Sequence, residues 1–395
     1  MSHSDSSSLP LVAGVETAGA ACGIKPAGRP DLALWHFPDG ARWAATVTNH
    51  QLRAAPVRRL EALRSASPRP LLRAIVVNSG NANACTGHSG MAAAESVATA
   101  AARELGCDPS QVLTCSTGVI GVPLPDDRIC AALPDLVGAL DPAGWARASA
   151  AIMTTDNGPK TAWREIGGVR IVGIAKGAGM IAPNMATMLA YVCTDADLDE
   201  ATLDDMLAAA VDASFNRIIV DGDQSTNDTV VLAATGKVAV RDRGAVAQAI
   251  REVCLELALM IVRDGEGARR IGRITVEGAP NDADALRIAR TIGLSPLVKT
   301  ALYGGDPNWG RIAAAAGNAG VPLDEFDLVI EVGGEVLYRN GDNCMTADVE
   351  ARAAAAMAQD EVPIRVVVGN GSGTATIWAS DLGHEYVTCN ADYRS

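Results

Sequence analysis

Residues 176–190 read KGAGMIAPNMATMLA, and they place a lone threonine, Thr187, between a glycine- and proline-rich loop and an apolar run. Two interpretations follow from these residue types. In one, the segment is a surface loop and Thr187 starts a strand. In the other, the Ala186–Thr187 bond is cut and Thr187 becomes an N-terminal nucleophile, whose α-amine, with an ordinary pKa of about 7.7–8.0, serves as the base. The residue types alone leave both interpretations open.

The same segment is a poor match for a phosphate-binding loop. Such a loop requires G-x-x-x-x-G-K-[ST], in which the lysine follows the glycines. Here Lys176 precedes both Gly177 and Gly179. Pro183 follows where a helix should begin. A strained loop of this composition would instead suit an N-to-O acyl shift by the Thr187 hydroxyl.

Outward from this segment, short apolar runs alternate with helical patterns, which predicts a mixed α/β (α+β) fold of layered helices and sheets. Strands are expected at 74–77, 170–175, 217–220, 229–234 and 364–368, and helices at 199–213 and 245–263. Thr346 should cap a helix over 347–359, with Asp348 in its first turn. Glycine- and asparagine-rich loops are expected at 78–90, 116–121, 221–229, 304–311 and 369–374. A weak boundary lies at 186/187.

Composition excludes several classes of protein. The chain has 395 residues, of which 48% are hydrophobic and 20% charged, as in ordinary globular proteins. A net charge of −13 argues against a nucleic-acid or anionic-membrane surface. The first residues lack the pattern of a signal peptide, and no run of ~18 apolar residues suggests a membrane span, so we expect a cytoplasmic protein. The nine cysteines form no C-x-x-C pair and the five histidines have no zinc-site spacing, so free thiols and no metal site are expected.

A nucleophile of this kind needs hydrogen-bond donors where negative charge develops. The segment CSTGVIG at 115–121 offers two, the Thr117 hydroxyl and the Gly118 N–H. Taken alone, this segment is more often a plain strand-to-turn junction.

Several stretches together resemble the ornithine acetyltransferase family, bifunctional members included. They are AIMTTDNGPK (151–160), KGAGMIAPNMATML (176–189), DGDQSTNDT (221–229), SPLVKTAL with GGDPNWGR (295–311) and YVTCNADYRS (386–395). GIKPAGRPDLAL (23–34) and NSGNANACTG (78–87) are similar as well, so the resemblance covers nearly the whole chain in order. Val47 and His50 depart from the family pattern, which leaves open a paralogue in a specialised pathway.

The resemblance implies a role for each matching position. The precursor would cut itself between Ala186 and Thr187 into an α chain (1–186) and a β chain (187–395). Thr187 would be the nucleophile, and Thr117 with Gly118 would form the oxyanion hole. The implied substrate contacts are Thr154, Lys176, Thr187, Glu266, Asn390 and Ser395.

The resemblance also implies the reaction. An acetyl group would move from N²-acetyl-L-ornithine to L-glutamate, regenerating N-acetylglutamate in cyclic arginine biosynthesis. Lys176 or a hydroxyl could hold the α-carboxylate of the substrate, and Glu266 could pair with its side-chain ammonium. No metal or organic cofactor and no nucleic-acid or membrane partner are implied, and an α₂β₂ assembly is expected. Whether acetyl-CoA is also a donor is left open.

Two other functions are compatible with the same residues. A self-processed amidase or aminopeptidase would pass the acyl group to water, so net hydrolysis of acetylornithine would identify it. A non-catalytic metabolite-binding protein would use the glycine-rich loops, and an intact, uncut chain in denaturing mass spectrometry would favour it.

Overall fold

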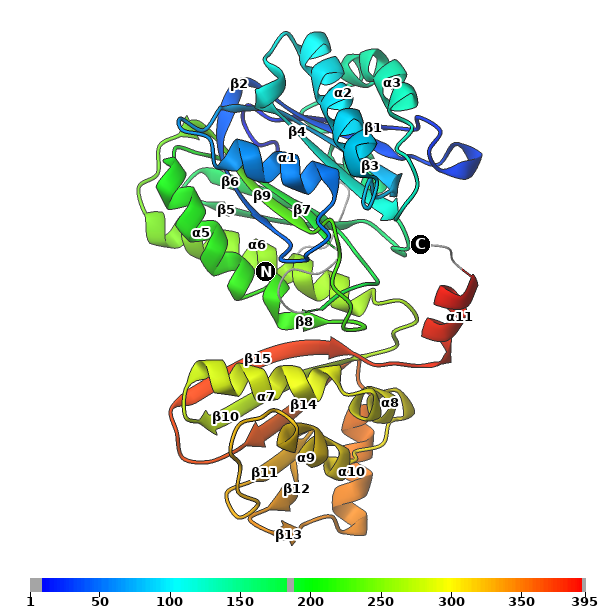
Figure 1. Cartoon of the computed structure of the whole chain (residues 1–395). Helices are drawn as coiled ribbons and strands as arrows, with labels where there is room; N and C mark the ends of the chain where they lie inside the picture. Colours follow the sequence, from blue (N-terminus) through cyan, green and yellow to red (C-terminus); the bar gives the residue numbers. More distant parts are fainter. Residues whose placement is uncertain (1–8, 183–187, 393–395) are drawn as a thin grey trace.

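The computed structural model describes residues 9–182 and 188–392, and these form two bodies that follow one another along the chain (Figure 1). The described residues of the first body build one sheet in the order β4-β3-β2-β9-β7-β6-β5, with β1 paired to β2. Its strands are β1 (Glu16–Ala20), β2 (Leu32–Val47), β3 (Leu72–Asn81), β4 (Val112–Val119), β5 (Lys160–Ile166), β6 (Val169–Lys176), β7 (Leu189–Ala196) and β9 (Thr229–Val238). The pairs β3–β4 and β7–β9 are parallel, and the other pairs are antiparallel.

This sheet folds over on itself at the long strand β2. The first part of β2 pairs with β3 and the last part pairs with β9, with a register shift between His36 and Ala41. Gly40, at φ +81°, lies in this bend, where the left-handed backbone favours glycine. Trp35 of β2 consequently meets Tyr191 of β7, with ring centroids 4.5 Å apart. The two halves of the sheet therefore stack face to face around a shared apolar core.

Helices cover both outer faces of the folded sheet (Figure 1). α2 (Gly87–Leu105) and α3 (Asp126–Gly138) pack on the face formed by β1 to β4. α5 (Glu200–Asp212) and α6 (Arg243–Arg263) pack on the face that contains β6, β7 and β9. α1 (Ala55–Arg64) and α4 (Trp145–Ile152) add side chains to the core between the two halves of the sheet. The described part of this body is thus a helix–sheet–sheet–helix sandwich.

The second body is a smaller helix-covered sheet, ordered β13-β12-β11-β14-β10-β15-β8 in the described residues. Its strands are β8 (Ile218–Ile219), β10 (Ile271–Ala279), β11 (Val329–Val332), β12 (Glu335–Arg339), β13 (Asp342–Asn343), β14 (Glu361–Val367) and β15 (Gly373–Ser380). Its helices are α7 (Asp282–Leu294), α8 (Pro296–Gly304), α9 (Trp309–Gly317) and α10 (Ala347–Met357). The short β8 enters this sheet from the chain of the first body, so it links the two. After β15 the described part of the chain ends in α11 (His384–Asp392), which lies at the side of the molecule (Figure 1).

The predicted α/β fold with layered helices and sheets is confirmed, and most of the expected elements are present. The helix expected at 245–263 begins earlier, at Arg243, because the Asp242 side chain caps it by accepting the Ala245 N–H at 3.0 Å. Thr346 caps α10 as expected, although this helix ends at Met357. The strand expected at 217–220 is wrong in its length, since a 3₁₀ turn (Phe215–Arg217) occupies its start and only Ile218–Ile219 pair.

Two segments expected to be loops are partly strand, so that prediction was wrong. Asn78–Asn81 continue β3, and Ser116–Val119 continue β4. The polar side chains there are buried because they satisfy one another across the parallel pair: the Ser116 hydroxyl donates to the Asn78 side chain at 2.6 Å. The loops at 78–90, 304–311 and 369–374 are also shortened by the neighbouring α2, α8, α9 and β15. The predicted cut at 186/187 lies outside the described residues.

Candidate active site

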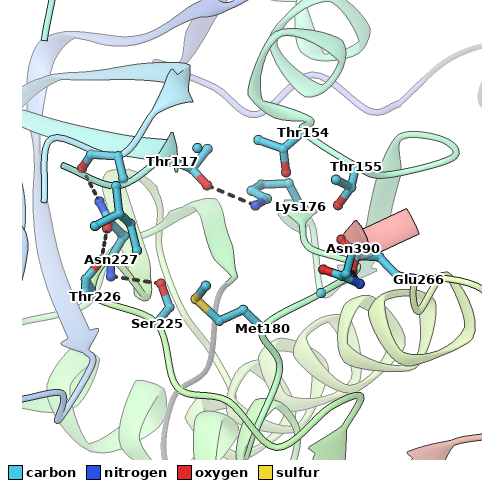
Figure 2. Close-up of a pocket in the computed structure, with 14 residues that line it drawn as sticks. Thr117, Thr154, Thr155, Lys176, Met180, Ser225, Thr226, Asn227, Glu266 and Asn390 are labelled. Carbon is cyan, nitrogen blue, oxygen red and sulfur yellow. Dashed lines mark hydrogen bonds between the residues drawn. The ribbon is translucent and has the colours of Figure 1, made fainter. Parts of the chain in front are cut away.

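A single cavity gathers side chains from segments that lie far apart in the sequence (Figure 2). It lies where the ends of β4 and β6 approach the loop before β9, the chain after α6, and α11. Its lining residues are Ala82, Thr117, Gly118, Ile120, Thr154, Thr155, Lys176, Gly179, Met180, Ser225, Thr226, Asn227, Glu266 and Asn390. Thr226 and Asn227 lie on one side of the pocket, Glu266 and Asn390 lie on the opposite side, and Thr117 with Lys176 lies between them (Figure 2).

Thr117 and Lys176 are buried and bonded to each other at the centre of this pocket. The Lys176 ammonium donates to the Thr117 hydroxyl oxygen at 3.0 Å, and each residue is 2% exposed. Since a protonated lysine has no acceptor, the O–H of Thr117 is left to donate to a group bound in the cavity. This pair therefore supplies a hydrogen-bond donor and a positive charge at one point.

The backbone around position 118 admits only glycine. The φ of Gly118 is +132°, and a Cβ at this position would lie 2.3 Å from the carbonyl carbon of Gly80 on β3. Asn227 locks the same region from the other side, because its amide donates to the Ala82 and Ser116 carbonyls at 2.7 and 2.8 Å. The tip of β4 that carries Thr117 is thus fixed by buried contacts.

A buried ion-pair network lies next to Lys176. The Asp156 carboxylate, whose side chain is fully buried, accepts the Lys160 ammonium at 2.6 Å and the Gly177 N–H at 2.7 Å. Burial opposes its ionisation, but Lys176 and Lys160 lower the pKa of Asp156 to about 2. Burial lowers the pKa of Lys176, whereas Asp156 raises it again. Asp156 therefore favours the charged form of an otherwise costly buried lysine.

The loop between Lys176 and the undescribed residues is held by Asp221. Its two carboxylate oxygens accept the N–H groups of Met180 and Ile181 at 2.6 and 2.9 Å. Met180 has φ +58°, an uncommon conformation for a residue with a side chain. Beyond the gap, the fully buried Asp228 accepts the Met188 N–H at 2.9 Å, and burial raises its pKa. Both described edges of the 183–187 segment are therefore fixed by carboxylates.

Glu266 and Asn390 form the opposite end of the pocket. The Asn390 amide donates to the Glu266 carboxylate at 2.8 Å, and the Glu266 N–H donates to the Ala178 carbonyl at 2.9 Å. A Cβ on Gly179 would lie 2.4 Å from the Glu266 carboxyl carbon. The loop therefore needs a glycine here to admit the carboxylate, which presents a negative charge to the cavity.

Six predicted site residues come together in this cavity: Thr117, Gly118, Thr154, Lys176, Glu266 and Asn390. Ala186, Thr187 and Ser395 lie outside the described residues. The sequence reasoning assigned no role to Asp156, Asp221, Asn227 or Asp228. All four lie in the segments TTDNGPK (154–160) and DGDQSTNDT (221–229). The many polar residues of these segments, next to apolar strands, were the sequence feature that could have indicated a role in the site.

The sequence also matches known proteins. Residues 16–395 match the family described as the ArgJ family. The chain belongs to this family. The arginine biosynthesis bifunctional protein ArgJ of Gluconobacter oxydans (strain 621H) is 46% identical over 399 residues, covering 98% of this chain and 93% of that protein. The ArgJ protein of Rhizobium meliloti (strain 1021) is 45% identical, over 98% of this chain and 96% of that protein. A crystal structure of the ArgJ protein from Bacillus halodurans shares 39% identity over 51% of this chain and 98% of that chain, with a TM-score of 0.49.

In residues 9–182 and 188–392 of this ArgJ-family chain, no cluster of three or more histidine, cysteine, aspartate or glutamate side chains has the arrangement of a metal site. None of the helices described has the length and apolar character needed to cross a bilayer. The expectation that no metal or organic cofactor is needed stays a prediction.

Proposed function

We propose that this chain is a self-processing acetyltransferase of arginine biosynthesis, which moves the acetyl group of N²-acetyl-L-ornithine to L-glutamate. The observation that carries the proposal is the cavity that unites Thr117, Lys176 and Glu266, three groups of different charge and chemistry. The name of the relatives, arginine biosynthesis bifunctional protein, supports the same pathway. So does the match to the family over residues 16–395.

The charges of the pocket suit a zwitterionic amino acid with a cationic side chain. Lys176 would attract the α-carboxylate of acetylornithine, with the Thr154 hydroxyl as a further donor. Glu266, on the side of the pocket opposite Thr226 and Asn227, would accept the side-chain ammonium (Figure 2). The positive charge of Lys176 and the negative charge of Glu266 would orient the substrate so that its acetyl group lies near Thr117 and Gly118.

In the proposed mechanism, Thr187 is the nucleophile and its free α-amine takes the hydroxyl proton. The new C–O bond gives a tetrahedral intermediate, whose oxyanion accepts hydrogen bonds from the Thr117 hydroxyl and the Gly118 N–H. The C–N bond to ornithine then breaks, and the leaving nitrogen takes the proton from the α-amine. The amine of glutamate attacks the acetyl-Thr187 ester in the reverse sequence, restoring the threonine hydroxyl.

Three further features belong to the same proposal. The word "bifunctional" in the relatives' names supports acetyl-CoA as an additional acetyl donor. Self-cleavage would yield an α chain and a β chain that assemble as α₂β₂. The nine cysteines, free in the described chain, are compatible with a cytoplasmic location.

The proposal is tested by following the acetyl group. Purified enzyme with acetylornithine and glutamate should form ornithine and acetylglutamate in equal amounts, and initial rates at several glutamate concentrations should give parallel lines in a double-reciprocal plot. Without glutamate, mass spectrometry should find one acetyl group on the first residue of the β chain. Net hydrolysis of acetylornithine would instead indicate an amidase. Intersecting lines without acetyl-Thr187 would indicate direct transfer in a ternary complex.

The close approach of Gly179 to Glu266 yields a second prediction. Gly179→Ala places a methyl group where the Glu266 carboxylate lies, so the KM for acetylornithine should rise at least about fivefold, the effect of ~1 kcal/mol of overpacking. Steady-state kinetics measures it. Gly158→Ala is the matched control, since a Cβ there meets no atom within 4 Å, and it should leave the KM unchanged. An unchanged KM in Gly179→Ala would show that Glu266 does not bind the substrate.

A further inference from the structure

The C-terminal helix α11 brings Asn390 to the pocket, but it buries very little of itself. Among its described side chains only Glu385 and Tyr386 are partly buried, and Val387 is 65% exposed. A helix of nine residues is unstable on its own in water. The position of α11 therefore depends on a small number of polar contacts and on the close approach of its backbone to Gly267.

One end of α11 is fastened to the second body. The Glu385 carboxylate accepts the Tyr303 hydroxyl of α8 at 2.8 Å and the Arg269 guanidinium that precedes β10. This guanidinium also lies over the Tyr303 ring, 4.5 Å from its centroid. The Tyr303 ring in turn packs against Gly383, where a Cβ would lie 1.9 Å from a ring carbon. The hydrogen bond from Tyr303, followed by those from the Glu385 backbone N–H and Arg269, lowers the pKa of Glu385 to about 2, so the carboxylate stays charged well below neutral pH.

The other contacts of α11 reach the active-site loop of the first body. The Tyr386 hydroxyl donates to Asp221 at 3.3 Å. Asp221 is the carboxylate that holds the Met180 and Ile181 N–H groups. Near the end of the helix, Asn390 donates to Glu266 at 2.8 Å. From Glu385 to Asn390 the helix rises about 7.5 Å, so one short rod connects the second body to the pocket.

We propose that Glu385 is a positioning residue: with Tyr303 and Arg269 it forms a latch through which the second body holds α11 against the pocket. The latch places Asn390 on Glu266 and so sets the affinity for the side-chain end of the amino-acid substrate. This inference rests on the function proposed above. It gives the second body a part in substrate binding that the lining of the cavity alone does not reveal.

The latch should affect binding more than chemistry. Thr117 and Lys176 are held by their mutual hydrogen bond and by the charge of Asp156, which affects the pKa of Lys176 more than the charge of Glu266 does. Loss of the latch leaves α11 with the Tyr386–Asp221 and Asn390–Glu266 hydrogen bonds and the close approach of its backbone to Gly267. The helix would then be detached from the pocket in a fraction of the molecules. Substrate binding would have to return it to the pocket, which raises the apparent dissociation constant of the substrate.

The test is Glu385→Gln, which keeps the shape of the side chain but removes its charge, together with Tyr303→Phe. Both variants should raise the KM for acetylornithine about three- to tenfold and change kcat less than about twofold, as for the loss of a hydrogen bond to a charged group. Hydrogen exchange by mass spectrometry should show faster exchange in 384–392, with unchanged exchange in β10 and β15. Glu335→Gln is the matched control, because Glu335 is paired with Arg352 at 2.8 Å in the same body, away from α11.

Unchanged exchange of 384–392 in both variants would overturn the latch, and so would faster exchange with an unchanged KM. A fall in kcat at constant KM would assign Glu385 to the chemical step instead. Hydrogen exchange needs no turnover, so it tests the latch even if the wild-type protein does not transfer acetyl to glutamate. Failure of the latch and failure of the proposed function are therefore distinguished.

Discussion

Thr187→Ala should remain a single 395-residue chain and lose acetyl transfer completely. Without the hydroxyl, no N-to-O acyl shift can begin at the Ala186–Thr187 bond, and no acetyl ester can form afterwards. Denaturing mass spectrometry should show two chains for the wild type, the second beginning at Thr187, and one chain for the variant. Acetylglutamate formation by the variant should fall to the uncatalysed background.

Thr187→Ser is the matched control for this experiment. It retains a hydroxyl and the following Met188 N–H anchor on Asp228, so it should still be cut and retain part of the activity. If Thr187→Ala were still cut at 186/187, self-cleavage by this residue would be excluded. Activity in the uncut Thr187→Ala chain would exclude its covalent role.

Thr117→Val should lower kcat by about 10²–10³, the cost of about 2.7–4 kcal/mol seen when one oxyanion-hole donor is removed. Valine has nearly the shape of threonine and suits β4, but it can neither donate to an oxyanion nor accept from Lys176. The ground-state affinity for acetylornithine should change much less, because the donor acts on charge that develops in the transition state. Steady-state kinetics combined with equilibrium binding of acetylornithine measures both quantities.

Thr117→Ser separates the loss of the hydroxyl from a disturbance of β4. Serine keeps the donor and the acceptor for Lys176, so its kcat should stay within about tenfold of the wild type, since only a methyl group is lost. A rise in the dissociation constant of acetylornithine with an unchanged kcat in Thr117→Val would place this hydroxyl in substrate binding. It would also remove it from the oxyanion hole.

Local rules accounted for the elements that depend on neighbouring residues. The cap of α10 by Thr346 follows from a side chain and an N–H three positions away. Of the apolar runs that became strands, β14 alternates buried and partly buried residues, and those of β6 and β9 are buried almost throughout, as expected of strands covered on both faces. Rules of this kind failed at 78–81 and 116–119, where polar residues continue two strands. Their burial depends on a partner 38 positions away, the Ser116–Asn78 hydrogen bond, which no local pattern contains.

The sequence by itself determined the mixed fold and the family, and it predicted the chemistry of the segment around Thr187, because these depend on residue types in an ordered series of motifs. Only the tertiary structure decided that Lys176 bonds to Thr117, 59 positions away, and that Asn390 bonds to Glu266, 124 positions away. It also revealed the carboxylates that fix the loop and the latch that positions α11. These contacts form only when β2 folds the sheet over and the second body supports α11. They join groups whose distance in space is set by packing rather than by their spacing along the chain.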